Sequence, residues 1–232
     1  MIRIKICCIE TAEEAALAVR AGASALGLVS DMPSGPGVIG DRQIREIASR
    51  VPPFVVPVLL TRRTEAEAIA EQVVACGIHA VQLCAPVELA ELDRLHRRLP
   101  ALSRIAVVHV AGPESLEEAR TLEGHVEALL LDTGIRTGPD VQLGGTGRTH
   151  DWAISQEIVR GAKVPVVLAG GLRPDNVANA IHRVEPWAVD VCSGVRSRAD
   201  NDSLPGHLRL DETKLRSFVH AVRTAAEGGP EC

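Results

Sequence analysis

The sequence predicts an α/β fold, a (β/α)8 TIM barrel that forms a single domain. Short runs of β-branched and aliphatic residues alternate with amphipathic helical stretches eight times along the chain, with no linker or low-complexity break. Glycine-bearing turns follow the last three of these runs, where a closed parallel barrel places its phosphate-binding loops. The 232 residues match the usual length of one such domain, and the last few are expected to form a tail.

The expected strands are short, and each is followed by a helical stretch. The strands are Ile2–Cys7, Ala25–Val29, Phe54–Leu60, Ala80–Leu83, Ile105–Val110, Ala128–Leu131, Val164–Ala169 and Ala188–Cys192. The helices are Ala12–Ala21, Asp41–Arg50, Glu65–Cys76, Val87–Arg97, Glu114–Glu123, Trp152–Arg160, Pro174–Arg183 and Glu212–Ala226. In the first helix Ala12, Ala16 and Val19 keep helical spacing, which indicates one buried face.

The long irregular stretches all follow strands. They are Ser30–Gly40, Thr133–Asp151 and Ser197–Leu210. Loops that follow parallel strands lie at the catalytic face of a barrel, so we expect the functional residues there. An open doubly wound sheet is the competing architecture, but it does not account for glycine turns so close to the C-terminus.

Composition excludes several classes of function. Aromatic residues make up 2% of the chain and the net charge is −5 with no basic run, which argues against nucleic-acid and anionic membrane partners. The six cysteines include no CxxC pair and the histidines show no ligand spacing, so no metal site is expected. The segment Met1–Ile6 is too short and too charged for a secretory signal. We therefore expect a cytoplasmic protein.

Glycine turns in the C-terminal half predict a phosphate site. Glycine lets backbone N–H groups approach an anion closely, and arrays of such groups bind anions. The residues expected to bind phosphate are Gly144, Gly145, Thr146, Gly147, Gly170, Gly171, Ser193 and Gly194. Each turn alone is compatible with a tight connection, but their repetition ahead of helical segments favours phosphate binding. The sequence indicates an enzyme that acts on a small phosphorylated substrate.

Several motifs carry a family resemblance in the right order and spacing. They are Lys5–Cys7, Val81–Leu83, Leu130–Thr133, Gly144–Gly147, Asp151–Trp152, Leu168–Leu172 and Ser193–Val195. Together they resemble the phosphoribosylanthranilate isomerase family of tryptophan biosynthesis. The resemblance spans the whole chain and is strongest in its C-terminal half.

This resemblance implies an Amadori rearrangement that converts an N-linked ribose 5-phosphate aminoaldose into an open-chain aminoketose. It makes Cys7 the general base and Asp132 the general acid, and it implies neither a metal nor an organic cofactor because the substrate's own nitrogen accepts the electron pair. These roles need a positive field beside the Cys7 thiol, such as Lys5, and a poorly solvated Asp132. The competing interpretations are a buried packing role for Cys7 and a capping role for Asp132.

The departures from the family pattern lie on the aglycone side of the substrate. Family members carry an arginine that is expected to hold the anthranilate carboxylate, and this chain has Gly37 at the aligned position. Arg136 is the first candidate to replace that arginine, and Arg196, which stands where the family has glutamate, is the second. Asp190 is expected to make an internal hydrogen bond or to contact a ribose hydroxyl.

Further departures concern cysteines. The glycine after Cys7 is here Cys8, and the family's His-Gly is Cys84-Ala85. Strand alternation predicts that Cys8 points away from Cys7 and packs, and Cys84 and Cys192 are expected in the core.

Two other functions stay open beside the anthranilate isomerase. One is an aldose–ketose isomerase that accepts an N-linked ribose phosphate with a different aglycone. The other is a non-catalytic barrel that binds a phosphate ligand, although a pure binder has no need of both Cys7 and Asp132. A monomer and a homodimer are both compatible with the sequence.

Overall fold

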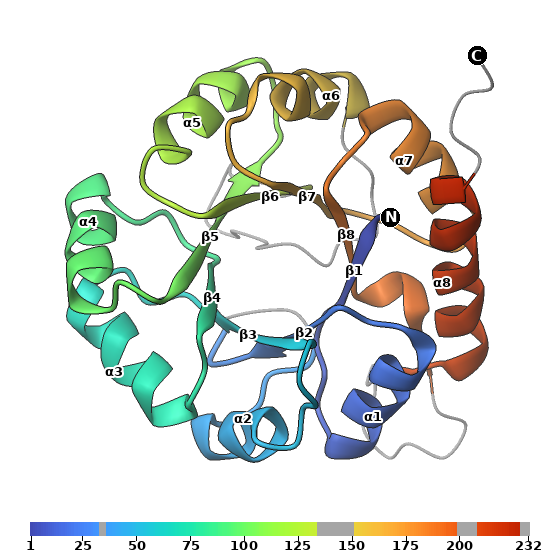
Figure 1. Cartoon of the computed structure of the whole chain (residues 1–232), viewed down its shortest axis with the longest axis horizontal. Coiled ribbons are helices and arrows are strands. Elements are labelled where there is room, and N and C mark those ends of the chain that lie inside the picture. Colours follow the sequence, from blue (N-terminus) through green and yellow to red (C-terminus); the bar gives the residue numbers. More distant parts are fainter. Residues whose placement is uncertain (33–35, 134–150, 199–207, 228–232) are drawn as a thin grey trace.

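The computed structural model describes residues 1–32, 36–133, 151–198 and 208–227. Within these ranges eight parallel strands close into a barrel in sequential order, and helices form a ring around it (Figure 1). The barrel closes between β1 (Arg3–Ile6) and β8 (Ala188–Val191), which pair in parallel. The predicted single-domain (β/α)8 barrel is therefore confirmed, while the expected tail falls on residues 228–232, outside the described ranges.

The element boundaries agree with the predicted ones to within three residues. The other strands of the barrel are β2 (Ala25–Val29), β3 (Val56–Thr61), β4 (Ala80–Leu83), β5 (Ser103–His109), β6 (Ala128–Asp132) and β7 (Val166–Leu168). The helices are α1 (Ala12–Ala21), α2 (Asp41–Ala48), α3 (Ala66–Cys76), α4 (Leu89–Arg98), α5 (Glu114–Leu122), α6 (Trp152–Gly161), α7 (Val177–Val184) and α8 (Glu212–Glu227).

The largest boundary difference is at the start of α7, which begins at Val177 instead of Pro174. Asn176 accounts for the delay, because its side chain closes a turn ahead of the helix. Its Oδ1 accepts from the Arg173 N–H at 2.7 Å, and its Nδ2 donates to the Gly171 carbonyl at 3.0 Å. Local side-chain bonds of this kind compete with the helix for backbone groups.

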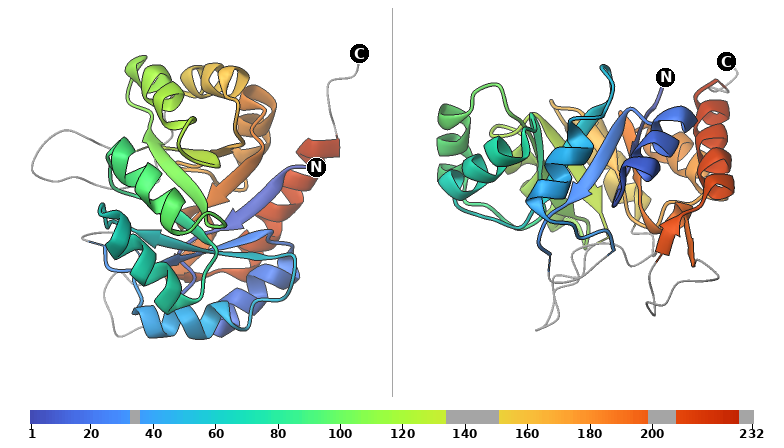
Figure 2. Two further views of the ribbon diagram at one scale, coloured as in Figure 1. Left: turned by 60° about the vertical axis from the view of Figure 1, so that its left-hand side comes forward. Right: turned by 90° about the horizontal axis from the view of Figure 1, so that it is seen from below.

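A short hairpin corrects the prediction of an irregular stretch after Ser197. The 3-10 turn η1 (Ser193–Val195) leads from β8 into β9 (Arg196–Arg198), which pairs antiparallel with β10 (Leu208–Leu210). Figure 2 shows this hairpin, coloured orange to red, at the end of the barrel opposite the N-terminus. The Leu210 N–H donates to Glu14 of α1 at 2.9 Å, so the hairpin ties the chain after β8 to the first helix.

Apolar side chains form two buried regions. One lies between the strands and the helices and includes Ile4, Leu26 and Phe218. The other lies inside the barrel and consists of two clusters, one that includes Val58 and one that includes Leu130. Two regions arise because successive strand residues point to opposite faces of the sheet.

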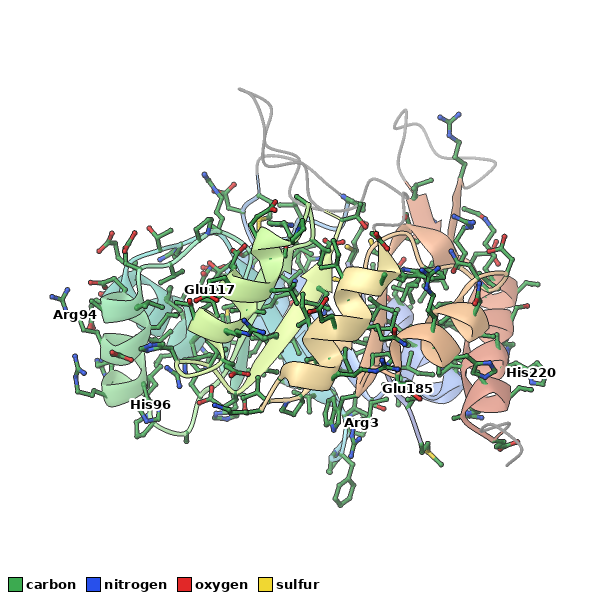
Figure 3. All side chains as sticks on the ribbon, turned by 90° about the horizontal axis from the view of Figure 1, so that it is seen from above. Arg3, Arg94, His96, Glu117, Glu185 and His220 are labelled. Carbon is green, nitrogen blue, oxygen red and sulfur yellow. The ribbon has the colours of Figure 1, made fainter. Side chains whose placement is uncertain are left out.

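The outer surfaces of the helices carry polar side chains. Figure 3 shows Arg94 and His96 on α4, Glu117 on α5 and His220 on α8. Among the described helices, none is both long enough and apolar enough to cross a membrane.

Candidate active site

One cavity opens at the C-terminal ends of the barrel strands. Its lining includes Cys7 and Cys8 after β1, Gln82 on β4, His109 on β5, Asp132 on β6, Gly170 and Gly171 after β7, and Asp190, Cys192 and Ser193 on and after β8. Parallel strands of a closed barrel all end at the same face, so side chains distant in the sequence meet there.

The Cys7 thiol lies beside the ammonium group of Lys5. Lys5 Nζ donates to Cys7 Sγ at 3.5 Å, and the same ammonium group pairs with Asp190 Oδ2 at 2.9 Å. Hydrogen bonding from the Cys8 thiol lowers the pKa of Cys7, and the charge of Lys5 lowers it further, while burial opposes both. These contacts shift Cys7 toward its thiolate, which is the basic form.

Gly27 makes room for the Cys7 sulfur. A Cβ atom at Gly27 of β2 would lie 2.7 Å from Cys7 Sγ and 3.1 Å from Cys7 Cα. Only glycine lets β2 pass this close to the end of β1, so the position of the thiol depends on the absence of a side chain on the neighbouring strand.

The pKa of Asp132 is shifted in the opposite direction from that of Cys7. Burial raises the pKa of Asp132 to about 6, although the Thr133 N–H donates to its Oδ1 at 2.7 Å and opposes the rise. His109 is the register partner of Asp132 across β5 and β6 and lines the same cavity. The cavity thus holds a thiol whose pKa is lowered and a carboxyl whose pKa is raised.

Two further side-chain oxygens are placed to accept hydrogen bonds from a bound molecule. Asp190 Oδ1 and Gln82 Oε1 are buried and have no partner among the described residues, and both side chains line the cavity. Buried polar atoms are normally hydrogen-bonded, so these oxygens suit donors from a ligand or from water.

Two of the three predicted phosphate-binding turns meet at this mouth. Gly170 and Gly171 adopt positive φ values of 83° and 64°, which favour glycine. A Cβ at Gly194 would lie 2.0 Å from the Leu172 carbonyl oxygen, so the turn after β8 packs against the turn after β7. Gly144, Gly145, Thr146 and Gly147 lie outside the described residues.

Comparison with known proteins identifies the family. Residues 4–204 match the family model described as N-(5'phosphoribosyl)anthranilate (PRA) isomerase. A protein of that name from Methanocella arvoryzae is 38% identical over 223 residues, which cover 96% of this chain and 99% of that protein. The chain belongs to the phosphoribosylanthranilate isomerase family.

Solved structures of the family superimpose on nearly the whole chain. A monomeric form of the dimeric enzyme from Thermotoga maritima matches with a TM-score of 0.77 at 28% identity, covering 97% of this chain and 100% of that one. A second family structure, solved with reduced 1-(o-carboxyphenylamino)-1-deoxyribulose 5-phosphate, matches with a TM-score of 0.77 at 29% identity and the same coverage.

Arg196 does not line the cavity. Its guanidinium is fully buried, donates to the Leu208 carbonyl at 3.0 Å and to the Cys8 carbonyl, and pairs with Glu14 at 3.2 Å. Its partners are thus protein groups, and it is not part of the cavity lining. The expectation that Arg196 holds a substrate carboxylate does not fit this placement, and Arg136 lies outside the described residues.

The cysteines also differ from expectation. Cys8 lines the cavity beside Cys7 because β1 ends at Ile6 and Cys8 adopts a positive φ of 65°, which breaks the strand alternation. Cys192 is partly exposed at the same mouth. Cys84 is buried as expected, and it also contributes to the lining.

The substitutions at positions 8 and 37 are sterically linked. Gly37 has a φ of 79°, and a Cβ there would lie 2.6 Å from Cys8 Cβ and 2.8 Å from Cys8 Cα. The family pattern expected from the sequence has glycine after Cys7 and arginine in this loop, whereas this chain has Cys8 and Gly37. The side chain and backbone of Cys8 occupy the space that a side chain at position 37 would need.

Sequence reasoning missed Gln82, His109 and Gly27 as site residues. Gln82 and His109 each occupy an inward position near the C-terminal end of an apolar strand, and that position is the signal that could have identified them. Gly27 offers no such signal, because its role depends on a contact between strands. Among the described residues no group of three His, Cys, Asp or Glu side chains is arranged to hold a metal ion.

Proposed function

We propose that this chain catalyses the phosphoribosylanthranilate isomerase reaction, the Amadori rearrangement of an N-linked ribose 5-phosphate aminoaldose to the open-chain aminoketose. The observation that carries the proposal is the pair Cys7 and Asp132, which face one cavity with pKa values shifted in opposite directions. Titratable groups whose environments separate their pKa values in this way are typical of general acid and base pairs.

In the proposed mechanism Asp132 is the general acid. Its carboxyl donates a proton to the furanose ring oxygen as the C1–O bond breaks, and the nitrogen lone pair forms the C1 iminium ion. Burial keeps the carboxyl protonated at mildly acidic pH, which this step needs.

Cys7 is the general base of the second step. Its thiolate removes the proton from C2, and the electron pair moves through C1 to the iminium nitrogen. The resulting enolamine tautomerises to the aminoketose. Lys5 supports the thiolate before the transfer, because its ammonium group lies 3.5 Å from the sulfur. No step needs a metal or an organic cofactor.

The phosphate is proposed to bind Gly170, Gly171, Ser193 and Gly194, together with the Gly144–Gly147 loop. The glycine conformations after β7 and the tight packing of Gly194 support this assignment. Asp190 Oδ1 is proposed to accept from a ribose hydroxyl, since Lys5 occupies only Oδ2. We further propose that the protein works in the cytoplasm as a monomer or homodimer.

A second candidate is the same rearrangement on a different aglycone. The contact between Gly37 and Cys8 favours it, because this loop cannot hold a carboxylate with a side chain at position 37. If the aglycone is anthranilate, its carboxylate needs another cation, and Arg136 is the proposed one. Turnover measurements separate the two candidates.

The test is the fluorescence decay of phosphoribosylanthranilate made in situ. We expect turnover by the wild-type protein and a loss of about 10²- to 10⁴-fold in kcat for Cys7→Ala. The matched control is Cys76→Ala, since Cys76 is buried on α3 and is not part of the cavity lining. Folded wild-type protein that binds ribose 5-phosphate without turning over this substrate would favour the different aglycone.

A further inference from the structure

Two cysteine sulfurs are in contact at the seam where the barrel closes. Cys192 Sγ donates to Cys8 Sγ at 2.6 Å, although the residues are 184 positions apart in the sequence. Cys8 follows β1 and Cys192 follows β8, the two strands whose pairing closes the barrel. Both cysteines are free thiols.

The surrounding backbone holds this pair in place. The Cys7 N–H donates to the Val191 carbonyl at 2.8 Å, which joins the residues preceding each cysteine across the seam. Arg196 donates to the Cys8 carbonyl, and Gly37 packs against the Cys8 Cβ. A disulfide has an S–S distance of about 2.04 Å, so only a small further approach of the sulfurs is needed.

A small oxidant can reach the pair through the site cavity. Both cysteines line this cavity, and Cys192 is partly exposed. Cys76, by contrast, is buried on α3.

We propose that Cys8 and Cys192 are a redox-active pair that a hydroperoxide converts into a disulfide, and that this disulfide slows turnover at the neighbouring Cys7. The formation of the disulfide is independent of the activity proposed above, whereas its effect on turnover rests on that activity.

The oxidation is balanced by the reduction of one peroxide. The Cys192 sulfur attacks a peroxide oxygen, the O–O bond breaks, and the leaving oxygen departs as water or alcohol while Cys192 becomes a sulfenic acid. The Cys8 sulfur then attacks the Cys192 sulfur, the S–O bond breaks, and water leaves as the S–S bond forms. The two thiols lose two electrons and two protons in total, and a dithiol reductant reverses the reaction.

The expected effect on turnover follows from the contacts of Cys7. Hydrogen bonding from the Cys8 thiol is the largest influence that lowers the pKa of Cys7, and a disulfide has no such hydrogen to donate. The ionisable groups that remain around Cys7 are Lys5 on β1, Asp190 on β8 and Cys84 after β4. Lys5 still favours the thiolate, so we expect turnover to be reduced and not abolished.

The experiment treats the full chain with hydrogen peroxide and follows three readouts. Peptide mapping is expected to find a bond between Cys8 and Cys192. The Tm is expected to rise by roughly 4–16 °C, because the bond closes a loop that spans 184 positions of the chain. Turnover is expected to fall several-fold, because the Cys8 hydrogen that lowers the pKa of Cys7 is lost, and dithiothreitol should restore both properties.

Cysteine variants test which residues form the disulfide. In Cys192→Ser, peroxide should change neither Tm nor turnover when the treated variant is compared with the same variant untreated. Cys192→Ala is a second choice if the serine variant does not fold. Cys76→Ser should keep both changes. Cys7→Ala should still form the bond, because Cys7 is not part of the pair.

Other outcomes would overturn the proposal or part of it. A disulfide that includes Cys7, or oxidation of Cys7 with no bond between Cys8 and Cys192, contradicts the assigned pair. A bond between the pair that leaves turnover unchanged contradicts the regulatory effect. If the reduced protein has no isomerase activity but forms the bond with the expected Tm rise, the pair is supported and the proposed function is the part that fails.

Discussion

Burial of the Asp132 carboxyl suits its proposed role as an acid but lowers the stability of the folded protein when the carboxyl is ionised. This carboxyl is partly buried at the barrel mouth, where burial raises the pKa to about 6, while the same carboxyl in an unfolded chain has a pKa of about 3.9. The folded protein therefore holds this proton more tightly than the unfolded chain. The destabilisation develops as the pH rises from about 4 to about 6 and is fully present above that range.

We therefore expect Asp132→Asn to lose activity and to gain stability. At pH 7.5 the gain in the free energy of unfolding should be roughly 2–3 kcal/mol, because the neutral amide keeps the bond from the Thr133 N–H without a buried charge. At pH 4.5 the gain should shrink to about a third. Urea denaturation at both pH values measures it, and an equal gain at both would contradict the raised pKa of Asp132.

The contact between Cys8 and Gly37 predicts that substitutions at these two positions affect stability in a coupled way. Gly37→Ala should destabilise the protein by about 1–3 kcal/mol, because the new Cβ meets Cys8 and the φ of 79° disfavours any side chain.

In a Cys8→Gly background the cost of Gly37→Ala should be smaller by about 1–2 kcal/mol, since the contact with the Cys8 Cβ is gone, while the backbone strain and the contacts with the Cα and carbonyl oxygen of residue 8 remain. A thermal double-mutant cycle measures this coupling. Additive effects of the two substitutions would mean that positions 8 and 37 are independent.

At the scale of elements, Arg196 and Glu14 join three parts of the chain. Glu14 lies in the first turn of α1 and accepts from both Arg196 of β9 and the Leu210 N–H of β10. Arg196 in turn binds the Cys8 carbonyl beside the site. This buried ion pair thus holds α1, the hairpin and the end of β1 together.

Arg196→Met should destabilise the protein by about 3–5 kcal/mol, because it leaves the Glu14 carboxylate buried without its partner. The double variant with Glu14→Gln should recover part of that loss. Arg94→Met is the matched control, since Arg94 pairs with Glu91 on the exposed surface of α4 and should cost less than about 1 kcal/mol (Figure 3). Chemical denaturation measures both losses. An equal loss of unfolding free energy for the two variants would show that Arg196 does not hold α1, the hairpin and the end of β1 together.

At the scale of the whole molecule, α8 covers the seam of the barrel. It packs against α7 and α1, and the β1–β8 pairing lies beneath it (Figure 1). Phe218 on its inner face is fully buried in the outer core. Closure of the ring therefore depends on a contact between the two ends of the sequence.

Phe218→Ala should lower the free energy of unfolding by about 3–5 kcal/mol, because it removes a large buried side chain and leaves a cavity. His220→Ala on the outer face of the same helix should change it by less than about 0.5 kcal/mol (Figure 3). Urea denaturation of both variants tests the difference. A small effect for Phe218→Ala would show that α8 is dispensable for closing the barrel.

The order of elements and the position of the site could be predicted because they depend on short-range patterns. Strand and helix periodicity located the barrel elements to within three residues, and the rule that parallel strands end at one face brought Cys7, Asp132 and Asp190 together. The start of α7 differed because an Asn176 side chain competes with the helix, which periodicity does not detect.

The sequence by itself determined the barrel, its family and the chemical types of residue at its mouth, since each of these depends on neighbours along the chain. Only the tertiary structure decided which side chains meet across the seam. In the folded chain Cys8 lines the cavity, its sulfur lies beside that of Cys192, and Arg196 is buried against Glu14. Such contacts depend on the register and twist of strands distant in the sequence, and no local periodicity encodes them.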